Sequence, residues 1–203
     1  MGVEVFAADE QNAVPVDAMR WVRLAEAVLA DEGVQADAEL SLLFVEEAAI
    51  AELNKRFLDR EGPTDVLAFP IDEEPAESGR SPDSGGSGPG FVADGDEIPM
   101  LLGDVVICPA VARRNAAQRS KAQPDQDDSH DDSNGAGGDG GSEQDQPDAS
   151  GFDDEMALLV VHGILHLLGM DHVDEEEAEA MEARERELLA SYHHSGKNYP
   201  SDA

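Results

Sequence analysis

The sequence has little cysteine, little positive charge and no long hydrophobic run, and each shortage excludes a class of protein. Cys108 is the single cysteine among 203 residues, so no disulfide forms within the chain, and we expect a buried thiol at a strand end. Lysine and arginine number 13 against 46 acidic residues, and this net charge of −33 disfavours a polyanionic partner. No apolar run could span a bilayer, and the N-terminus lacks a signal-peptide pattern, so we expect a cytoplasmic protein without membrane contact.

Two stretches have the composition of disordered segments. Residues 73–97 are rich in glycine, serine, proline and acids, and residues 122–151 are acidic with no lysine or arginine. Such segments cannot bury enough apolar surface to offset the entropy lost on ordering. The sequence therefore predicts one catalytic domain that carries two insertions and a polar tail. The domain comprises residues 1–72, 98–121 and 152–192, and the tail is 193–203.

The hydrophobic periodicity of the remaining sequence alternates between strand and helix patterns. Apolar residues at every second position indicate strands, and apolar residues at helical spacing indicate helices. The expected strands are 2–7, 38–45, 66–69 and 101–107, and the expected helices are 14–31, 46–57, 109–121, 152–168 and a last helix that begins after Asp174.

Three histidines, His162, His166 and His172, follow the spacing H-x3-H-x5-H. Positions i and i+4 lie on one face of a helix, so the first two project side by side. Gly169 can end this helix in the left-handed conformation and let the chain bring His172 back to the same place. Three neutral imidazoles with one open coordination position are typical of a catalytic zinc site. We therefore expect one Zn²⁺ per chain, on a helix whose nearly continuous apolar surface indicates burial.

The spacing also matches the metzincin pattern at every histidine and at the glycine, but not at the general base. The catalytic glutamate of zinc peptidases is replaced by Gly163, which cannot accept a proton. The motif therefore favours metal-assisted hydrolysis and argues against ordinary peptidase chemistry.

Several other acidic and histidine residues are candidates for roles near this site. Asp171 and Asp65 are weak candidates for the missing base. Glu155 could orient a ligand histidine, although an acid in the first turn of the helix is the simpler interpretation. His193 and His194 are adjacent in sequence and therefore face apart on a helix, so we do not expect them to join the site.

The only basic cluster lies on the helix expected at 109–121. It includes Arg113, Arg114 and Arg119, and it is either a solvated helix face or a surface that contacts phosphates. Arg113, Arg114 and Arg60 are our weak candidates for substrate binding.

Three ordered segments resemble the YbeY family of rRNA maturation endoribonucleases. They are PTDVLAFP at 63–70, LGDVVI at 102–107 and HGILHLLGMDH at 162–172. The resemblance implies a small α+β domain with a mixed sheet of about four strands, packed helices and a zincin-like site on a buried central helix. It also implies zinc ligands at His162, His166 and His172. Many members carry an arginine thought to serve RNA cleavage where this chain has Leu58.

These observations favour a zinc-dependent endoribonuclease that acts on single-stranded RNA. The family is implicated in maturing small-subunit rRNA, including the 3′ end of 16S rRNA, and in ribosome quality control. Expected partners are rRNA and the small ribosomal subunit or its assembly factors, and no DNA. Two alternatives stay open: a metal-dependent hydrolase of another substrate, such as a peptide, and a ribosome-assembly binding factor with a mainly structural zinc.

Overall fold

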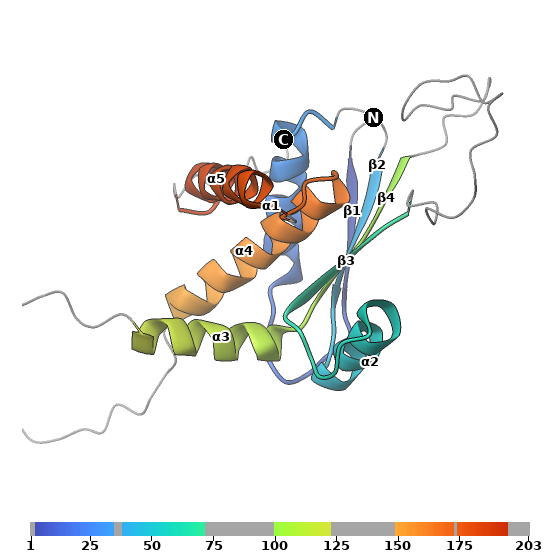
Figure 1. The fold of residues 1–203 in the computed structure, drawn as a ribbon, viewed down its shortest axis with the longest axis vertical. Coiled ribbons are helices and arrows are strands. Elements are labelled where there is room, and N and C mark those ends of the chain that lie inside the picture. Colours follow the sequence, from blue (N-terminus) through green and yellow to red (C-terminus); the bar gives the residue numbers. More distant parts are fainter. Residues whose placement is uncertain (1–2, 35–37, 72–99, 123–148, 173, 195–203) are drawn as a thin grey trace, which may run out of the picture.

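A computed structural model describes residues 3–34, 38–71, 100–122, 149–172 and 174–194 (Figure 1). The two expected insertions fall almost wholly outside these ranges, as does most of the expected tail. The division into one domain, two insertions and a tail therefore stays a prediction.

Four strands form one mixed sheet in the order β1-β2-β4-β3. Their bounds are β1 Glu4–Asp9, β2 Ala38–Phe44, β3 Val66–Pro70 and β4 Met100–Ile107. β1 pairs with β2 and β2 with β4 in parallel, while β3 pairs with β4 antiparallel. The mixed sheet of four strands is confirmed, although β1 begins two residues later than the alternation of its side chains predicted.

Five helices cover the sheet within the described part of the chain. They are α1 Ala18–Asp31, α2 Glu47–Leu58, α3 Pro109–Ala122, α4 Ala149–Leu167 and α5 Glu175–Tyr192. In Figure 1, α1, α4 and α5 lie on one side of the sheet and α2 lies on the other. β4 contributes side chains to the cores on both faces of the sheet. Val105 and Ile107 pack in the core with α1, α4 and α5, while Val106 packs in a smaller core with Ile50 of α2.

Two helices begin three or four residues away from where the sequence predicted. α1 begins at Ala18 rather than Val14, because the side chain of Asp17 caps it by accepting a hydrogen bond from the Arg20 backbone N–H. α4 begins at Ala149, three residues before the expected Phe152. Cys108 is buried directly after β4, as expected. Among the helices that the structure describes, none is both long enough and apolar enough to traverse a lipid bilayer.

Candidate metal centre

Helix α4 is the element that positions the three histidines. Its apolar side chains are buried against α1, α3, α5 and the sheet, and they include Met156, Val160, Val161, Ile164 and Leu165. His162 and His166 are the polar exceptions near its C-terminal end, and both are partly exposed. A buried helix of this kind holds its side chains in fixed positions, since a close-packed interior leaves few alternative rotamers.

The turn after α4 has the hydrogen bonds of a Schellman motif. The Gly169 N–H donates to the His166 carbonyl at 3.0 Å, and the Met170 N–H donates to the Leu165 carbonyl at 3.0 Å. Gly169 has a φ of 89°, so it is the left-handed residue that the sequence predicted. This turn reverses the chain and brings His172 beside the two helical histidines.

The three imidazole rings converge on one point. Their centroids lie 4.5 Å apart for His162 and His166, 5.1 Å for His166 and His172, and 5.7 Å for His162 and His172. One ring nitrogen of each lies within 4.8 Å of the others. The Nε2 atoms of His162 and His166 are 3.1 Å apart. Two ligands of a tetrahedral zinc, each 2.0–2.1 Å from the metal, are about 3.3–3.4 Å apart, so this spacing fits a shared ion.

Hydrogen bonds on the far side of two rings fix which nitrogen faces the centre. His166 Nδ1 lies 3.0 Å from the Met170 carbonyl oxygen, which can only accept, so Nδ1 carries the proton. His162 Nδ1 lies 2.7 Å from Oε1 of Glu185 and donates to that carboxylate. In the neutral rings both Nε2 atoms then present lone pairs to each other at 3.1 Å. Such a pair is repulsive unless a cation lies between the atoms, which fits a metal ion.

The surroundings of His166 favour the neutral ring that a metal ligand requires. Burial lowers the pKa of His166, and the neighbouring His162 and His172 rings lower it further. The Met170 carbonyl and Asp171 act in the opposite direction without reversing the shift. His166 therefore stays uncharged to a lower pH than an exposed histidine.

Glu185 of α5 is the functional residue that the sequence reasoning missed. It is buried between Met181 and Leu188 on the inner face of α5. The sequence contained the signal, because Met181 and Leu188 are apolar residues at helical spacing and residue 185 falls on the same stripe. A carboxylate at a buried position requires a partner, and that partner is His162. A carboxylate that holds a metal-ligating histidine in this way orients the ring and raises its basicity.

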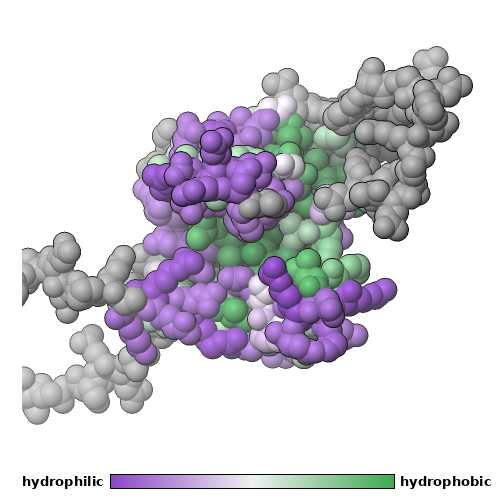
Figure 2. Space-filling model, in the orientation of Figure 1, coloured by the Kyte–Doolittle hydropathy of each residue, from purple (hydrophilic) through white to green (hydrophobic). Residues whose placement is uncertain are grey.

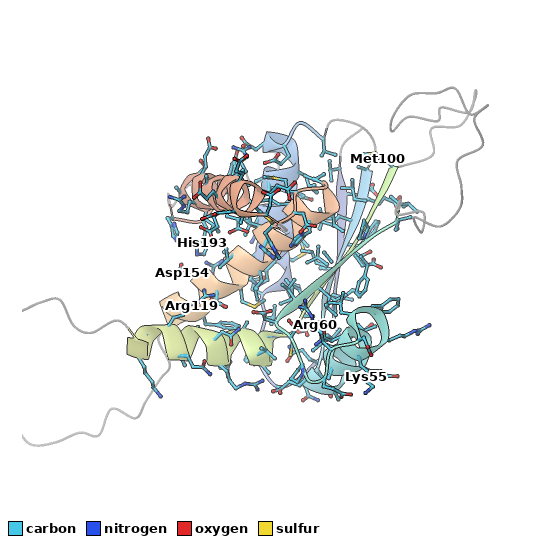
Figure 3. The ribbon with its side chains drawn as sticks, in the orientation of Figure 1. Lys55, Arg60, Met100, Arg119, Asp154 and His193 are labelled. Atoms are coloured by element: carbon cyan, nitrogen blue, oxygen red, sulfur yellow. The ribbon has the colours of Figure 1, made fainter. Side chains whose placement is uncertain are left out.

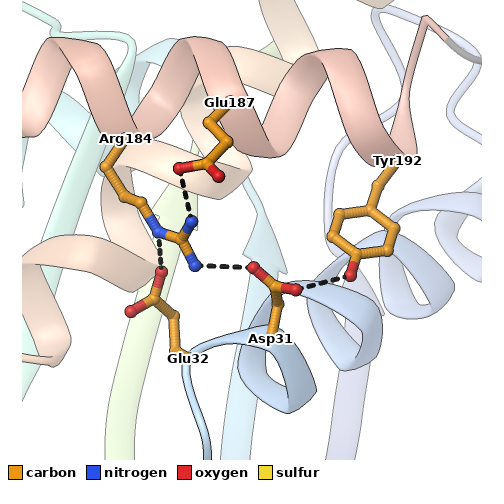
Figure 4. A network of polar contacts seen from close by, with 5 residues as sticks. All are labelled: Asp31, Glu32, Arg184, Glu187 and Tyr192. Atoms are coloured by element: carbon orange, nitrogen blue, oxygen red, sulfur yellow. Dashed lines mark hydrogen bonds and ion pairs between the residues drawn. The ribbon is translucent and has the colours of Figure 1, made fainter.

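Arg184, the neighbour of Glu185, fixes α5 against the end of α1 (Figure 4). Its guanidinium donates to Glu32 and Asp31 at 2.6 Å and to Glu187 at 2.7 Å. The hydrogen bonds to Glu32 and Glu187 raise the pKa of Arg184. The Tyr192 hydroxyl donates to Asp31 from the end of α5. This network helps keep Glu185 within reach of His162.

Gly163 has a steric reason to be glycine. A Cβ atom built there would lie 2.5 Å from Cγ1 of Val105 on β4, much closer than real carbon atoms approach. The side chain of any other residue would therefore point into the sheet. This contact explains why the position of the peptidase glutamate cannot carry a base in this fold.

The two candidate bases have different surroundings. Asp171 is exposed beside the three rings, and its Oδ1 accepts from the His172 backbone N–H at 2.7 Å. Both oxygens of Asp65 are occupied: Oδ1 accepts from the Val66 N–H at 2.9 Å and Oδ2 from Asn115 Nδ2 at 3.0 Å. Asp65 therefore acts as a brace between β3 and α3, and Asp171 retains the freer carboxylate.

Glu155 takes neither role weighed from the sequence. α4 begins at Ala149, so Glu155 lies beyond the first turn, and the side chain that orients His162 is Glu185. Glu155 is 2% exposed and pairs with Arg119 of α3. Burial raises its pKa, while Arg119 opposes the shift. Its Oε1 has no hydrogen-bond partner within the described part of the chain.

The arginine candidates are not equivalent. Arg114 is paired with Glu47 of α2, and the guanidinium of Arg113 lies 5.5 Å from the ring centre of Phe152. The guanidinium of Arg60, beside the start of β3, forms no ion pair with any residue that the structure describes (Figure 3). Arg60 is therefore the candidate most available to a phosphate.

An exposed apolar surface lies at the end of α2, just before Arg60 in the chain. Figure 2 shows an apolar band between the polar surface of α5 and those of α2 and α3. Phe57 and Leu58 at the end of α2 are 54% and 50% exposed. The Phe57 ring packs edge to face on Phe69 of β3, with centroids 5.0 Å apart. The Phe69 carbonyl and the Leu167 side chain both border Gly103, so this aromatic pair lies near the end of α4.

Comparisons with known proteins indicate the family of the chain. The family model described as endoribonuclease YbeY matches residues 6–127 and 141–193. Proteins named endoribonuclease YbeY are similar to the chain: that of Frankia casuarinae is 38% identical, with 93% of this chain and 74% of that protein aligned. That of Acidothermus cellulolyticus is 38% identical, with 90% of this chain and 87% of that protein aligned. That of Salinispora tropica is 36% identical, with 95% of this chain and 96% of that protein aligned. A Thermotoga maritima protein with a solution structure is 20% identical with a TM-score of 0.47, covering 98% of this chain and all of that one.

Proposed function

The chain belongs to the endoribonuclease YbeY family, and we propose that it is a zinc-dependent endoribonuclease that cuts single-stranded RNA. We further propose that its substrate is the maturing rRNA of the small subunit, including the 3′ end of 16S rRNA, and that it serves ribosome quality control. Its partners are then the small ribosomal subunit or its assembly factors. The observation that carries the proposal is the convergence of three imidazoles on one point. In His162 and His166, the Nδ1 atom that faces away from this point is already hydrogen-bonded.

In this proposal His162, His166 and His172 hold one zinc ion on the buried helix α4, a zincin-like arrangement. A bound zinc supplies a Lewis acid for a phosphate oxygen and lowers the pKa of water toward neutrality. The histidines bring no charge of their own, so the full positive charge remains for the transition state of phosphodiester cleavage. Glu185 and the Met170 carbonyl keep the two helical rings aimed at the ion.

Asp171 is the better of the two candidate bases, because Asp65 is committed to hydrogen bonds at both oxygens. An exposed carboxylate beside the ligands can accept a proton from an attacking water or hydroxyl. On this account Asp171→Asn slows cleavage and leaves zinc content unchanged, and Asp65→Asn acts on folding stability. Normal cleavage by Asp171→Asn would remove that residue from the mechanism.

Substrate binding falls to Phe57 and Arg60. Unstacked bases of single-stranded RNA stack on exposed aromatic rings, and arginines beside them contact phosphates. Arg56 supports the same surface, since its guanidinium lies 5.2 Å from the Phe57 ring centre. Of the 46 acidic residues of the chain, nine fall in residues 122–150, apart from this surface in sequence. Screening by salt also weakens repulsion between separated charges.

The test is cleavage of single-stranded rRNA fragments by the purified protein after its metal has been quantified. We expect about one zinc at the three-histidine centre, cleavage that a chelator stops, and recovery on adding zinc. A duplex of the same sequence serves as the control and is cut poorly. Cleavage that persists in metal-stripped protein would refute zinc dependence. Peptidase activity lost on His166→Ala would instead support the hydrolase alternative, and ribosome maturation by a folded His166→Ala protein would support the binding factor.

A further inference from the structure

A second group of metal-ligating side chains lies away from the three-histidine centre. Asp154 of α4 and the consecutive His193 and His194 at the end of α5 place one ligand atom each within 4.8 Å of the others. Figure 3 shows Asp154 and His193 next to each other where the two helices meet. Sequence reasoning separated these histidines from the first centre, which is what the structure shows, but it did not find Asp154 as their neighbour.

The donor atoms lie close enough together to contact one ion. Oδ1 of Asp154 lies 2.7 Å from Nε2 of His193 and 3.5 Å from Nε2 of His194. The shorter separation is a hydrogen bond, and the longer one is close to the roughly 3.3 Å expected between two ligands of a tetrahedral ion of zinc size, so an ion would replace the hydrogen-bonding proton and move Asp154 and His193 slightly apart. The rings have centroids 5.0 Å apart and planes at 63°, so they are not stacked and their nitrogens can converge.

The backbone holds the two histidines together despite their adjacency. The N–H groups of His193 and His194 both donate to the Leu189 carbonyl at 2.9 Å, which winds the chain tightly at the end of α5. The His193 side chain is 6% exposed, while those of His194 and Asp154 are about half exposed. One fixed ligand and two accessible ones leave room for solvent to complete the coordination.

The charges of the neighbouring acids single out Asp154. Asp153 pairs with Arg20 of α1, and Glu155 pairs with Arg119 of α3, so each of these is neutralised by a permanent cation. Asp154 instead faces two imidazoles, and the Nε2 atom of His193 donates a hydrogen bond to it. Unlike a guanidinium, an imidazole can give up this proton and bind a metal through the same nitrogen. The C-terminal end of a helix also carries partial negative charge, which favours a cation there.

We propose that Asp154, His193 and His194 bind a second divalent cation of the transition series, such as Zn²⁺, Co²⁺ or Ni²⁺. Two imidazoles and one carboxylate suit these ions rather than Mg²⁺ or Ca²⁺. The ion joins the N-terminal half of α4 to the end of α5, the helix that supplies Glu185 to His162. This site is independent of the proposed RNA cleavage, so metal binding alone tests it.

The test is a titration of metal-stripped full-length protein with Co²⁺, followed by calorimetry and by visible absorption, which distinguishes imidazole ligation from loose binding to carboxylates. We expect two sites in the wild type. The variant His193→Ala/His194→Ala retains one, and His166→Ala retains the other, weaker one. His130→Ala, which removes the remaining histidine, is the matched control and keeps both.

Asp154→Asn provides a second variant that preserves shape, and it weakens the second site at least tenfold. A circular dichroism melt of each variant verifies folding before the titration. A single Co²⁺ site in the wild type would overturn the proposal, as would two unchanged sites in the His193→Ala/His194→Ala variant.

Discussion

The two halves of α4 use polar side chains in opposite ways. In the N-terminal half, the consecutive acids Asp153, Asp154 and Glu155 each contact a different helix, through Arg20, His193 and Arg119. In the C-terminal half, His162 and His166 turn one nitrogen each toward a shared centre, and hydrogen bonds hold the opposite nitrogens. The acids of the first half tie α4 to neighbouring helices, Asp154 through the second metal site proposed above, whereas the histidines of the second half surround an open centre.

The difference shows how one buried helix can serve both structure and chemistry. Charged groups are costly to bury without a partner, so the buried Glu155 is paired with Arg119, and its more exposed neighbours Asp153 and Asp154 also have partners. Neutral imidazoles are less costly, and those of the second half can face an open position. The following predictions separate the two halves, because a change in one should leave the property of the other intact.

The largest effect is expected for His166→Ala. Loss of one of three ligands removes zinc from the centre, and RNA cleavage falls to the rate of metal-stripped protein. Metal content and the cleavage of single-stranded RNA are the two measurements. His193→Ala, which removes the histidine at the end of α5 that contacts Asp154 in the other half of α4, is the control that keeps full cleavage. Comparable losses of RNA cleavage in both variants would show that the two halves of α4 do not differ in function.

Gly163→Ala should disturb the C-terminal half through packing. The added Cβ would lie 2.5 Å from Cγ1 of Val105, so α4 must move away from β4. We expect a loss of about 1–3 kcal/mol in the free energy of unfolding, measured in urea, together with weaker zinc binding. The double variant Gly163→Ala/Val105→Ala should recover zinc affinity by making room. A single variant as stable and as tight as the wild type would contradict the close contact.

Glu185→Ala should lower zinc affinity by about 10–100-fold without abolishing binding, since it removes the group that orients a ligand. Glu185→Gln should be milder, because its amide oxygen can still accept from His162 Nδ1. Competition with a chromophoric chelator measures both. Glu182→Ala, an exposed acid one turn earlier on α5, is the matched control. Equal affinities for Glu185→Ala and Glu182→Ala would show that Glu185 has no role at the centre.

Glu155→Gln should change stability in the N-terminal half in a pH-dependent way. The pKa of Glu155 is raised in the folded protein, mainly by burial, so the folded state holds its proton to a higher pH than the unfolded chain. Its contribution to stability is therefore full below the unfolded value of about 4.5 and declines as pH rises through the folded value. Relative to the wild type, Glu155→Gln should be less stable in acid than at neutral pH.

Urea unfolding of both proteins at several pH values measures this difference, and metal affinity should not change. A stability difference that is constant with pH, or that has the opposite slope, would contradict the raised pKa.

The sequence could predict the C-terminal half of α4 far better than the N-terminal half. Ligand spacing is local, so His162, His166 and the left-handed Gly169 follow from helical geometry alone. The strands and most helix limits were likewise visible as periodicity. The sequence reasoning misplaced Glu155, because its partner Arg119 is 36 residues away and only the fold brings them together.

The role of Glu185 could be predicted only in part. Its place on the inner stripe of α5 was visible in the sequence, but its partner His162 was not, because the packing of α5 on α4 depends on tertiary contacts. The steric requirement at Gly163 was hidden for the same reason, since Val105 belongs to a distant strand. What the sequence conceals is therefore the pairing between elements rather than the chemistry within one.

The central claim is that a cation lies between the imidazoles of His162, His166 and His172. Anomalous diffraction at the zinc absorption edge, from crystals of protein purified without chelators and active on single-stranded RNA, tests it directly. The account predicts a strong anomalous peak about 2.0–2.1 Å from Nε2 of His162 and of His166, with His172 as the third ligand. The absence of a peak at that position in fully active protein would contradict it.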